Sequence, residues 1–102
     1  MNKLSKTQQN LLEFALVKLY SFLKLKYNVD YTGNILCIVY DDIIHLNQCS
    51  CPNGVAWFAD IVLKDRKIHI STREVERDTI YSKFDYDLFY MGSKPTIHTV
   101  SF

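Results

Sequence analysis

The side chains best suited to chemistry gather between His45 and Cys51. His45 is followed by Cys49 and Cys51, a spacing of H-x3-C-x-C. An imidazole and thiolates at close spacing are typical ligands of tetrahedral zinc. Cys37 or His69 would supply a fourth ligand. The chain has no second C-x2-C or H-x3-H pair to complete a site, so the alternative is a loop whose thiols hold no metal.

A second pattern lies at Asp65-Arg66-Lys67, which has the D-x-K spacing of restriction-type nuclease sites. In those sites carboxylates bind Mg²⁺ and the lysine positions the attacking water. The upstream acid would be Asp41, Asp42 or Asp60. Here Arg66 stands where an apolar residue is usual, and the triplet falls in an expected turn. We therefore favour solvated turn charges over a nuclease site.

The other polar residues indicate no reaction. His45, His69 and His98 are not accompanied by a nucleophile motif, and the glycines are too isolated for a phosphate-binding loop. No cofactor is expected, and a non-enzymatic role is favoured over an enzyme.

The charge distribution is more informative than the net charge of +1. Residues 1–28 carry five lysines and Glu13, whereas residues 29–102 carry seven basic and ten acidic groups. The basic groups around the Lys64–Lys67 turn are interleaved with carboxylates, so nucleic-acid binding is the weaker expectation.

The length of 102 residues and the hydrophobic content of 48% predict a single domain, residues 1–102, with one core. Three cysteines without a preceding secretory signal indicate reduced thiols and a cytoplasmic location, the host cytoplasm for a viral or phage protein. Charges interrupt the apolar N-terminal stretch, so no membrane span is expected. Nine lysines to three arginines, with many Ile, Asn and Tyr residues, indicate an AT-rich genome such as that of a phage or virus.

Ser5-Lys6-Thr7-Gln8 matches the capping box and predicts a helix that runs to about Tyr27. The apolar residues of this helix occupy roughly two thirds of its circumference, well beyond the ~100° stripe of a surface helix. One sheet face cannot cover such an arc. We therefore expect later elements of the chain, a second copy or a partner protein to cover the residues that widen it: Phe14, Val17, Tyr20 and Leu25.

The rest of the chain has strand patterns. Ile35–Tyr40 is apolar and β-branched, as in a buried central strand. Further strands are expected at 43–46, 55–63, 68–72, 84–90 and 96–102, with turns at 41–42, 64–67 and 91–95 and a loop at 47–54. Residues 73–83 fit either a helical turn or a polar edge. The predicted fold class is α+β, a long N-terminal amphipathic helix packed on a mostly antiparallel sheet of about five strands.

These features favour a small protein-binding module, of the inhibitor or immunity type found in phages, viruses and other mobile elements, and a homodimer is one form considered for it. Tyrosine-rich surfaces are common at interfaces. Besides the four helix residues, the expected interface residues are Tyr81, Asp85, Tyr86, Asp87 and Tyr90. The alternative is a small zinc- or nucleic-acid-binding protein that uses His45, Cys49 and Cys51 or the Lys64–Lys67 turn.

Overall fold

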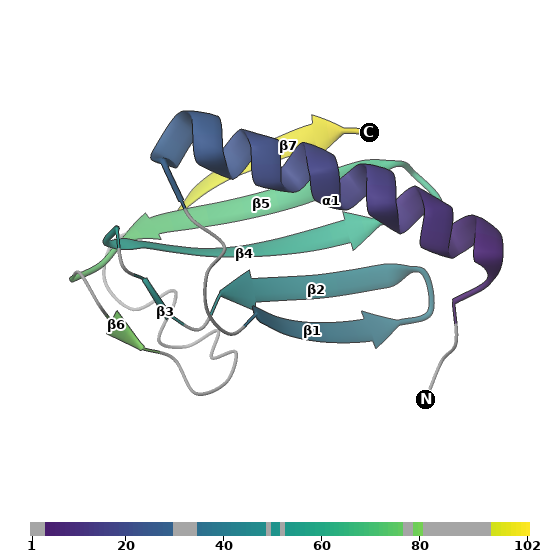
Figure 1. Cartoon of the computed structure of the whole chain (residues 1–102), viewed down its shortest axis with the longest axis horizontal. Helices are drawn as coiled ribbons and strands as arrows, with labels where there is room; N and C mark the ends of the chain where they lie inside the picture. Colours follow the sequence, from purple (N-terminus) through teal and green to yellow (C-terminus); the bar gives the residue numbers. More distant parts are fainter. Residues whose placement is uncertain (1–3, 30–34, 49, 52, 77–78, 81–94) are drawn as a thin grey trace.

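Helix α1 (Lys6–Tyr27) lies across one face of a five-stranded antiparallel sheet in the computed structural model (Figure 1). The structure describes residues 4–29, 35–48, 50–51, 53–76, 79–80 and 95–102. The α+β fold predicted from the sequence is confirmed. No helix in the described ranges is long and apolar enough to cross a membrane. The strands are β1 (Ile35–Tyr40), β2 (Ile43–Gln48), β3 (Ser50–Cys51), β4 (Val55–Val62), β5 (Lys67–Glu74), β6 (Thr79–Ile80) and β7 (Thr96–Ser101).

Both ends of α1 are set by local hydrogen bonds. Ser5 Oγ accepts the Gln8 N–H at 3.1 Å, and Gln8 Oε1 accepts the Ser5 N–H at 2.8 Å. This reciprocal pair is the capping box predicted from the sequence. At the other end Asn28 adopts a left-handed conformation with φ 53°, and its N–H donates to the carbonyls of Leu23 and Lys24. Asparagine tolerates this conformation better than most residues, so the helix stops here.

The strand order in the main sheet is β1-β2-β4-β5-β7, with every neighbouring pair antiparallel. The two-residue turn Asp41–Asp42 joins β1 to β2, and residues 63–66 join β4 to β5. Asp41 and Arg66 take positive φ values of 47° and 51° in these turns. The sheet in the described chain therefore ends in β1 on one side and β7 on the other.

The prediction of a central position for Ile35–Tyr40 was wrong. This segment is β1, an edge strand that pairs with β2. The composition of a strand reflects the environment its side chains favour, whereas its place in the sheet depends on which backbones pair. The tight turn fixes β2 as one neighbour, and no described strand of the chain lies on the other side.

The main core fills the space between α1 and the sheet. Ala15, Leu19 and Leu23 form the buried stripe of the helix, four residues apart, and each is 0% exposed. That stripe packs against alternate residues of the central strands, because alternate residues share one face of a sheet. The fully buried sheet residues of this core are Ile44, Ala59, Ile61, Ile68 and Ile70.

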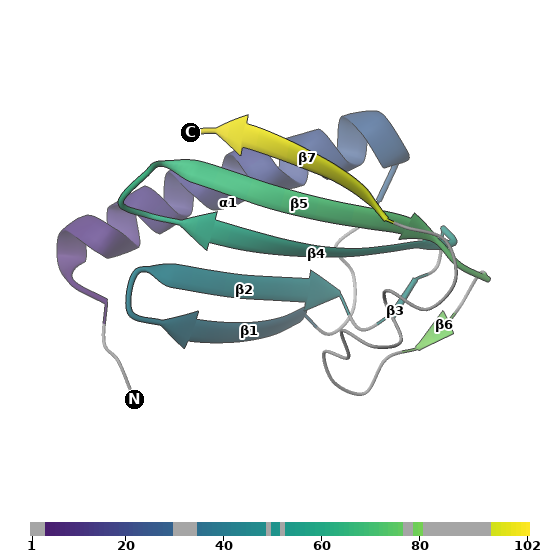
Figure 2. The same ribbon diagram turned by 180° about the vertical axis from the view of Figure 1, so that it is seen from behind.

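A smaller cluster lies on the other face of the sheet. Cys51 of β3 packs there with Ala56 and Phe58 of β4, and Val75 borders the cluster. The short strand β3 pairs with β6, which forms a second two-stranded sheet beside one end of the main sheet (Figure 2). Thus the expected loop at 47–54 contains a strand, and the ambiguous segment 73–83 contains the end of β5 and β6.

Strand β2 also extends two residues further than expected, to Gln48. Gln48 is 2% exposed, and its Oε1 accepts the indole N–H of the buried Trp57 at 3.0 Å. A buried indole N–H requires an acceptor. The hydrogen bond therefore explains how Gln48 can be buried at the end of the strand.

Candidate functional site

The outer face of α1 is the first candidate site. Of the four residues expected at an interface, Phe14, Val17 and Leu25 are 65%, 68% and 87% exposed. At 100° per residue these three side chains lie within about 80° of one another, on the side away from the core stripe. The exposed Ser21 lies between Val17 and Leu25 along this side. We call Phe14, Val17 and Leu25 the outer row. The described strands of this chain leave it uncovered.

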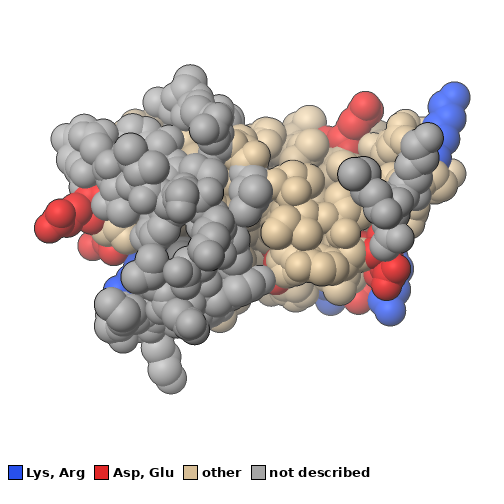
Figure 3. All heavy atoms as spheres, turned by 90° about the horizontal axis from the view of Figure 1, so that it is seen from below, with Lys and Arg blue, Asp and Glu red and all other residues tan. Residues whose placement is uncertain are grey.

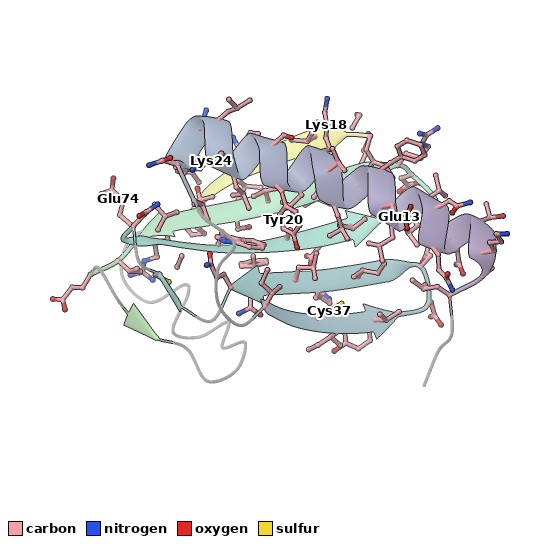
Figure 4. All side chains as sticks on the ribbon, viewed as in Figure 1. Glu13, Lys18, Tyr20, Lys24, Cys37 and Glu74 are labelled. Atoms are coloured by element: carbon pink, nitrogen blue, oxygen red, sulfur yellow. The ribbon has the colours of Figure 1, made fainter. Side chains whose placement is uncertain are left out.

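The outer row is bordered by charge. Lys18 and Lys24 flank it on opposite sides and are exposed, with Glu13 near its start (Figure 4). Two shallow depressions lie along the helix, one lined by Asn10, Glu13, Phe14 and Val17 and the other by Tyr20, Ser21, Lys24 and Leu25. Lysines account for four of the five charged residues within α1, so the helix has a cationic surface with an apolar centre.

Tyr20 differs from the outer row because it is half-buried between α1 and the sheet. It packs against the core and lies near Cys37 of β1 (Figure 4). Burial raises the pKa of the Tyr20 phenol, and the nearby Cys37 raises it further. Burial also raises the pKa of the Cys37 thiol, which therefore stays protonated and is not an activated nucleophile.

The residues proposed for zinc are distributed over several strands. His45 lies on β2, on the face away from the helix, and Cys51 is buried in the cluster with Phe58. Cys37 is opposite Leu46 in the register and so shares the helix side, which excludes it as a fourth ligand for His45. Cys49 lies outside the described residues. Within the described part of the chain no three His, Cys, Asp or Glu residues form a metal-binding group, and the zinc site stays a prediction.

His45 instead belongs to a polar row that the sequence did not reveal. Asp60 of β4 has two direct neighbours in the register of the sheet. His45 lies opposite it on β2, and His69 lies opposite it on β5. Nδ1 of His45 forms an ion pair with Oδ1 of Asp60, and Nδ1 of His69 is hydrogen-bonded to Thr99 Oγ1 at 3.2 Å. The row crosses the sheet face opposite α1, the face seen in Figure 2. The rings of Tyr40 and His45 pack edge-to-face, with 5.2 Å between their centroids.

The environment of Asp60 determines what this row can do. Burial raises the pKa of the Asp60 carboxyl, and the neighbouring imidazoles of His45 and His69 offset part of that rise. Such a pair can hold and exchange a proton. The described side chains beside it include no activated nucleophile. The pairing of Asp60 with His69 could be predicted from the sequence, because only a short turn joins β4 to β5. The pairing of Asp60 with His45 depends on the longer connection from β2 to β4.

The other expected site residues are less informative. Lys64, Asp65 and Arg66 are exposed in the β4–β5 turn, as expected for solvated turn charges. Asp60, one of the acids considered for a nuclease site, is paired with His45. The tyrosine-rich acidic residues lie outside the described residues: Tyr81, Asp85, Tyr86, Asp87 and Tyr90.

Comparison with known proteins does not place this chain in a family. No family model, no curated protein and no solved structure matches it.

Proposed function

We propose that this chain is a non-enzymatic protein-binding module whose docking surface is the outer row of α1. The observation that supports the proposal is the exposure of Phe14, Val17 and Leu25 on a helix whose opposite face is fully buried. An amphipathic helix with a second apolar face matches the helix-in-groove mode of recognition, in which residues about one turn apart enter a hydrophobic groove. An inhibitor or immunity-type protein of a phage, virus or mobile element would use such a surface.

The partner proposed for this surface is a different protein with an apolar groove bordered by carboxylates. Phe14 and Leu25 are eleven residues apart, which corresponds to about 16 Å of helix. Over that length the flanking charges Lys18 and Lys24 favour an acidic rim. A second copy is a poorer occupant, because a two-fold helix contact centred near Val17 would bring the two Lys18 side chains together.

The test compares three versions of the full chain as bait in a lysate of its source organism: the unmodified chain, Phe14→Glu with Leu25→Glu, and Ile97→Glu. Ile97 is the matched control, since it is 62% exposed but lies on β7. A protein that is retained by the unmodified chain and the Ile97 variant, is lost with the helix variant, and dissociates as salt rises would support the proposal.

Two outcomes would contradict it. One is retention of the same protein by all three baits, which would place the contact elsewhere on the chain. The other is capture of nucleic acid alone with steep salt dependence, which would favour the nucleic-acid alternative. Urea unfolding of each bait shows whether the substitutions leave the fold intact.

A further inference from the structure

Strand β1 has an unusual composition for its position. Its six residues, Ile-Leu-Cys-Ile-Val-Tyr, include no charged residue, no proline and no glycine. Nevertheless β1 is an edge of the five-stranded sheet, and among the described strands it pairs with β2 alone. Edge strands usually carry lysine, proline, a bulge or an inward-pointing charge, because their free backbone groups otherwise pair with another chain. None of these devices is present in β1.

The opposite edge of the sheet provides an internal comparison. Strand β7 follows Pro95, and four of its six residues are polar: Thr96, His98, Thr99 and Ser101. That pattern is typical of an ordinary solvent-facing edge. The two edges of one sheet therefore differ in kind, and β1 is the edge suited to pairing.

The described side chains of β1 itself are uncharged on both faces of the sheet. On the helix side Cys37 is exposed and Tyr20 is half-buried near it. On the other side Ile38 and Tyr40 are 36% and 54% exposed. Figure 3 views the molecule from the β1 side, and the centre of the described surface there shows neither acidic nor basic side chains. An added strand would cover apolar atoms on both faces.

We propose that β1 is a dimerisation edge, at which β1 of a second copy pairs antiparallel and continues the sheet across the two protomers. The uncharged strand meets its own copy without like-charge repulsion, and an antiparallel pair of identical strands satisfies two-fold symmetry. Both outer edges of the resulting sheet are β7, so the assembly closes at two copies. This surface is separate from the outer row of α1.

The length of β1 indicates which side chains must contribute contact area to the proposed dimer. Six residues of strand span about 20 Å. A stable interface buries about 800 Å² on each partner, more than a strand edge alone supplies. The flanking residues Ile38, Tyr40 and Tyr20 must therefore contribute contact area, and we expect a dimer that dissociates on dilution.

Analytical ultracentrifugation of the full chain over a wide concentration range tests the proposal. The unmodified chain should sediment as a dimer that gives way to monomer on dilution. Ile38→Lys, which places a charge beside the edge, should sediment as a monomer at every concentration. Ile97→Lys makes the same change on the other edge strand and should dimerise like the unmodified chain. Loss of the dimer in both variants would overturn the assignment to β1.

Cross-linking supplies a test that needs no substitution. Cys37 lies near the middle of β1, so antiparallel pairing brings the two Cys37 thiols within reach of a short bis-maleimide. The reaction should be run at mildly alkaline pH, because partial desolvation raises the pKa of the Cys37 thiol. Peptide mapping should identify a Cys37–Cys37 link between two chains.

Two results would contradict the proposed β1 dimer. The first is a strict monomer at all concentrations without a Cys37–Cys37 link. The second is a dimer that persists in Ile38→Lys and is lost in Val17→Lys, which would assign dimerisation to α1. The first result leaves the outer row available, so it does not bear on the proposed partner-binding function. The second would show that a second copy occupies the outer row, and it would count against a different protein as its partner.

Discussion

His45 and Asp60 lie directly opposite each other on neighbouring strands, and their side chains form an ion pair on the sheet face that α1 does not cover. Both side chains are roughly three-quarters buried, with exposed fractions of 26% and 28%. His69 occupies the matching position on the far side of Asp60. The carboxylate is therefore held between two imidazoles from separate strands, in a position where desolvation and neighbouring charge oppose each other.

Replacing His45 by alanine should lower the free energy of unfolding at neutral pH by about 1 kcal/mol, because the partly buried carboxyl of Asp60 loses its hydrogen-bond partner. Urea unfolding measures the loss. The same substitution in an Asp60→Asn background should cost less, since no buried charge remains to be paired. Equal losses in the two backgrounds would show that the ion pair contributes nothing and that packing with Tyr40 accounts for the effect.

The pH dependence of Asp60→Asn should follow from the raised pKa of Asp60. The folded protein binds this proton more tightly than the unfolded chain does. The associated stabilisation is thus complete below the ordinary value of 3.8 and is lost as pH rises through the folded pKa. Asparagine does not titrate, so the stability of the variant relative to the unmodified protein should increase from about pH 3 to pH 7. A difference that stays constant or decreases over that range, in urea unfolding at each pH, would contradict the prediction.

The free energy of unfolding should decrease on mild acidification, because His98 has a lowered pKa in the folded protein. Thr72 Oγ1 donates to the Tyr27 hydroxyl at 3.0 Å, so the hydroxyl directs its own proton to Nε2 of a neutral His98, 2.8 Å away. Burial lowers the pKa of His98, and Lys26 lowers it further. The unfolded chain therefore binds the proton more readily, and this stabilisation is complete above 6.5 and lost as pH falls through the folded pKa.

Tyr27→Phe tests this chain of hydrogen bonds. The variant should be about 1 kcal/mol less stable at neutral pH, because the ring nitrogen of His98 and the Thr72 hydroxyl lose their partner. The difference from the unmodified protein should shrink as pH falls below 6.5, since protonated His98 no longer accepts the hydrogen bond. His98→Asn, which removes the titrating ring, serves as the control and should abolish that pH dependence.

Two leucines on the same helix should respond very differently to the same substitution. Leu23 is fully buried and Leu25 is 87% exposed. Leu23→Ala should lower the free energy of unfolding by about 2–5 kcal/mol, because it leaves a cavity in the core. Leu25→Ala should change it by no more than about 0.5 kcal/mol. Thermal or urea unfolding distinguishes them, and a large loss from Leu25→Ala would mean that the outer row stabilises the fold rather than serving as a free surface.

The local features of the fold could be predicted from the sequence. The capping box Ser5–Gln8 and the end of the helix near Tyr27 depend on residues close together in the chain, and both are confirmed. The β4–β5 hairpin is likewise confirmed, although β4 ends at Val62 and β5 begins at Lys67. Surplus apolar residues on the helix could also be counted in advance, so the sequence predicted that Phe14, Val17, Tyr20 and Leu25 need cover from later elements, a second copy or a partner. The structure packs Tyr20 against the core and leaves the other three exposed.

The place of β1 could not be predicted in this way. Its apolar, β-branched residues describe a strand that favours burial, but they do not specify which backbones lie beside it. The polar row is a similar case, because His45 and Asp60 meet through the register of β2 against β4. That register depends on a connection whose geometry no local pattern dictates.

The sequence by itself determined the helix, its caps, its two apolar faces and the strand character of the later segments, because these depend on propensities and periodicities within a few residues. The tertiary structure decided which apolar surface is buried and which is left open. It buries Ala15, Leu19 and Leu23 in the core, exposes the outer row, and places the uncharged β1 at an edge. Burial and strand pairing are relations between distant segments, so only the folded arrangement of α1 and the sheet settles them.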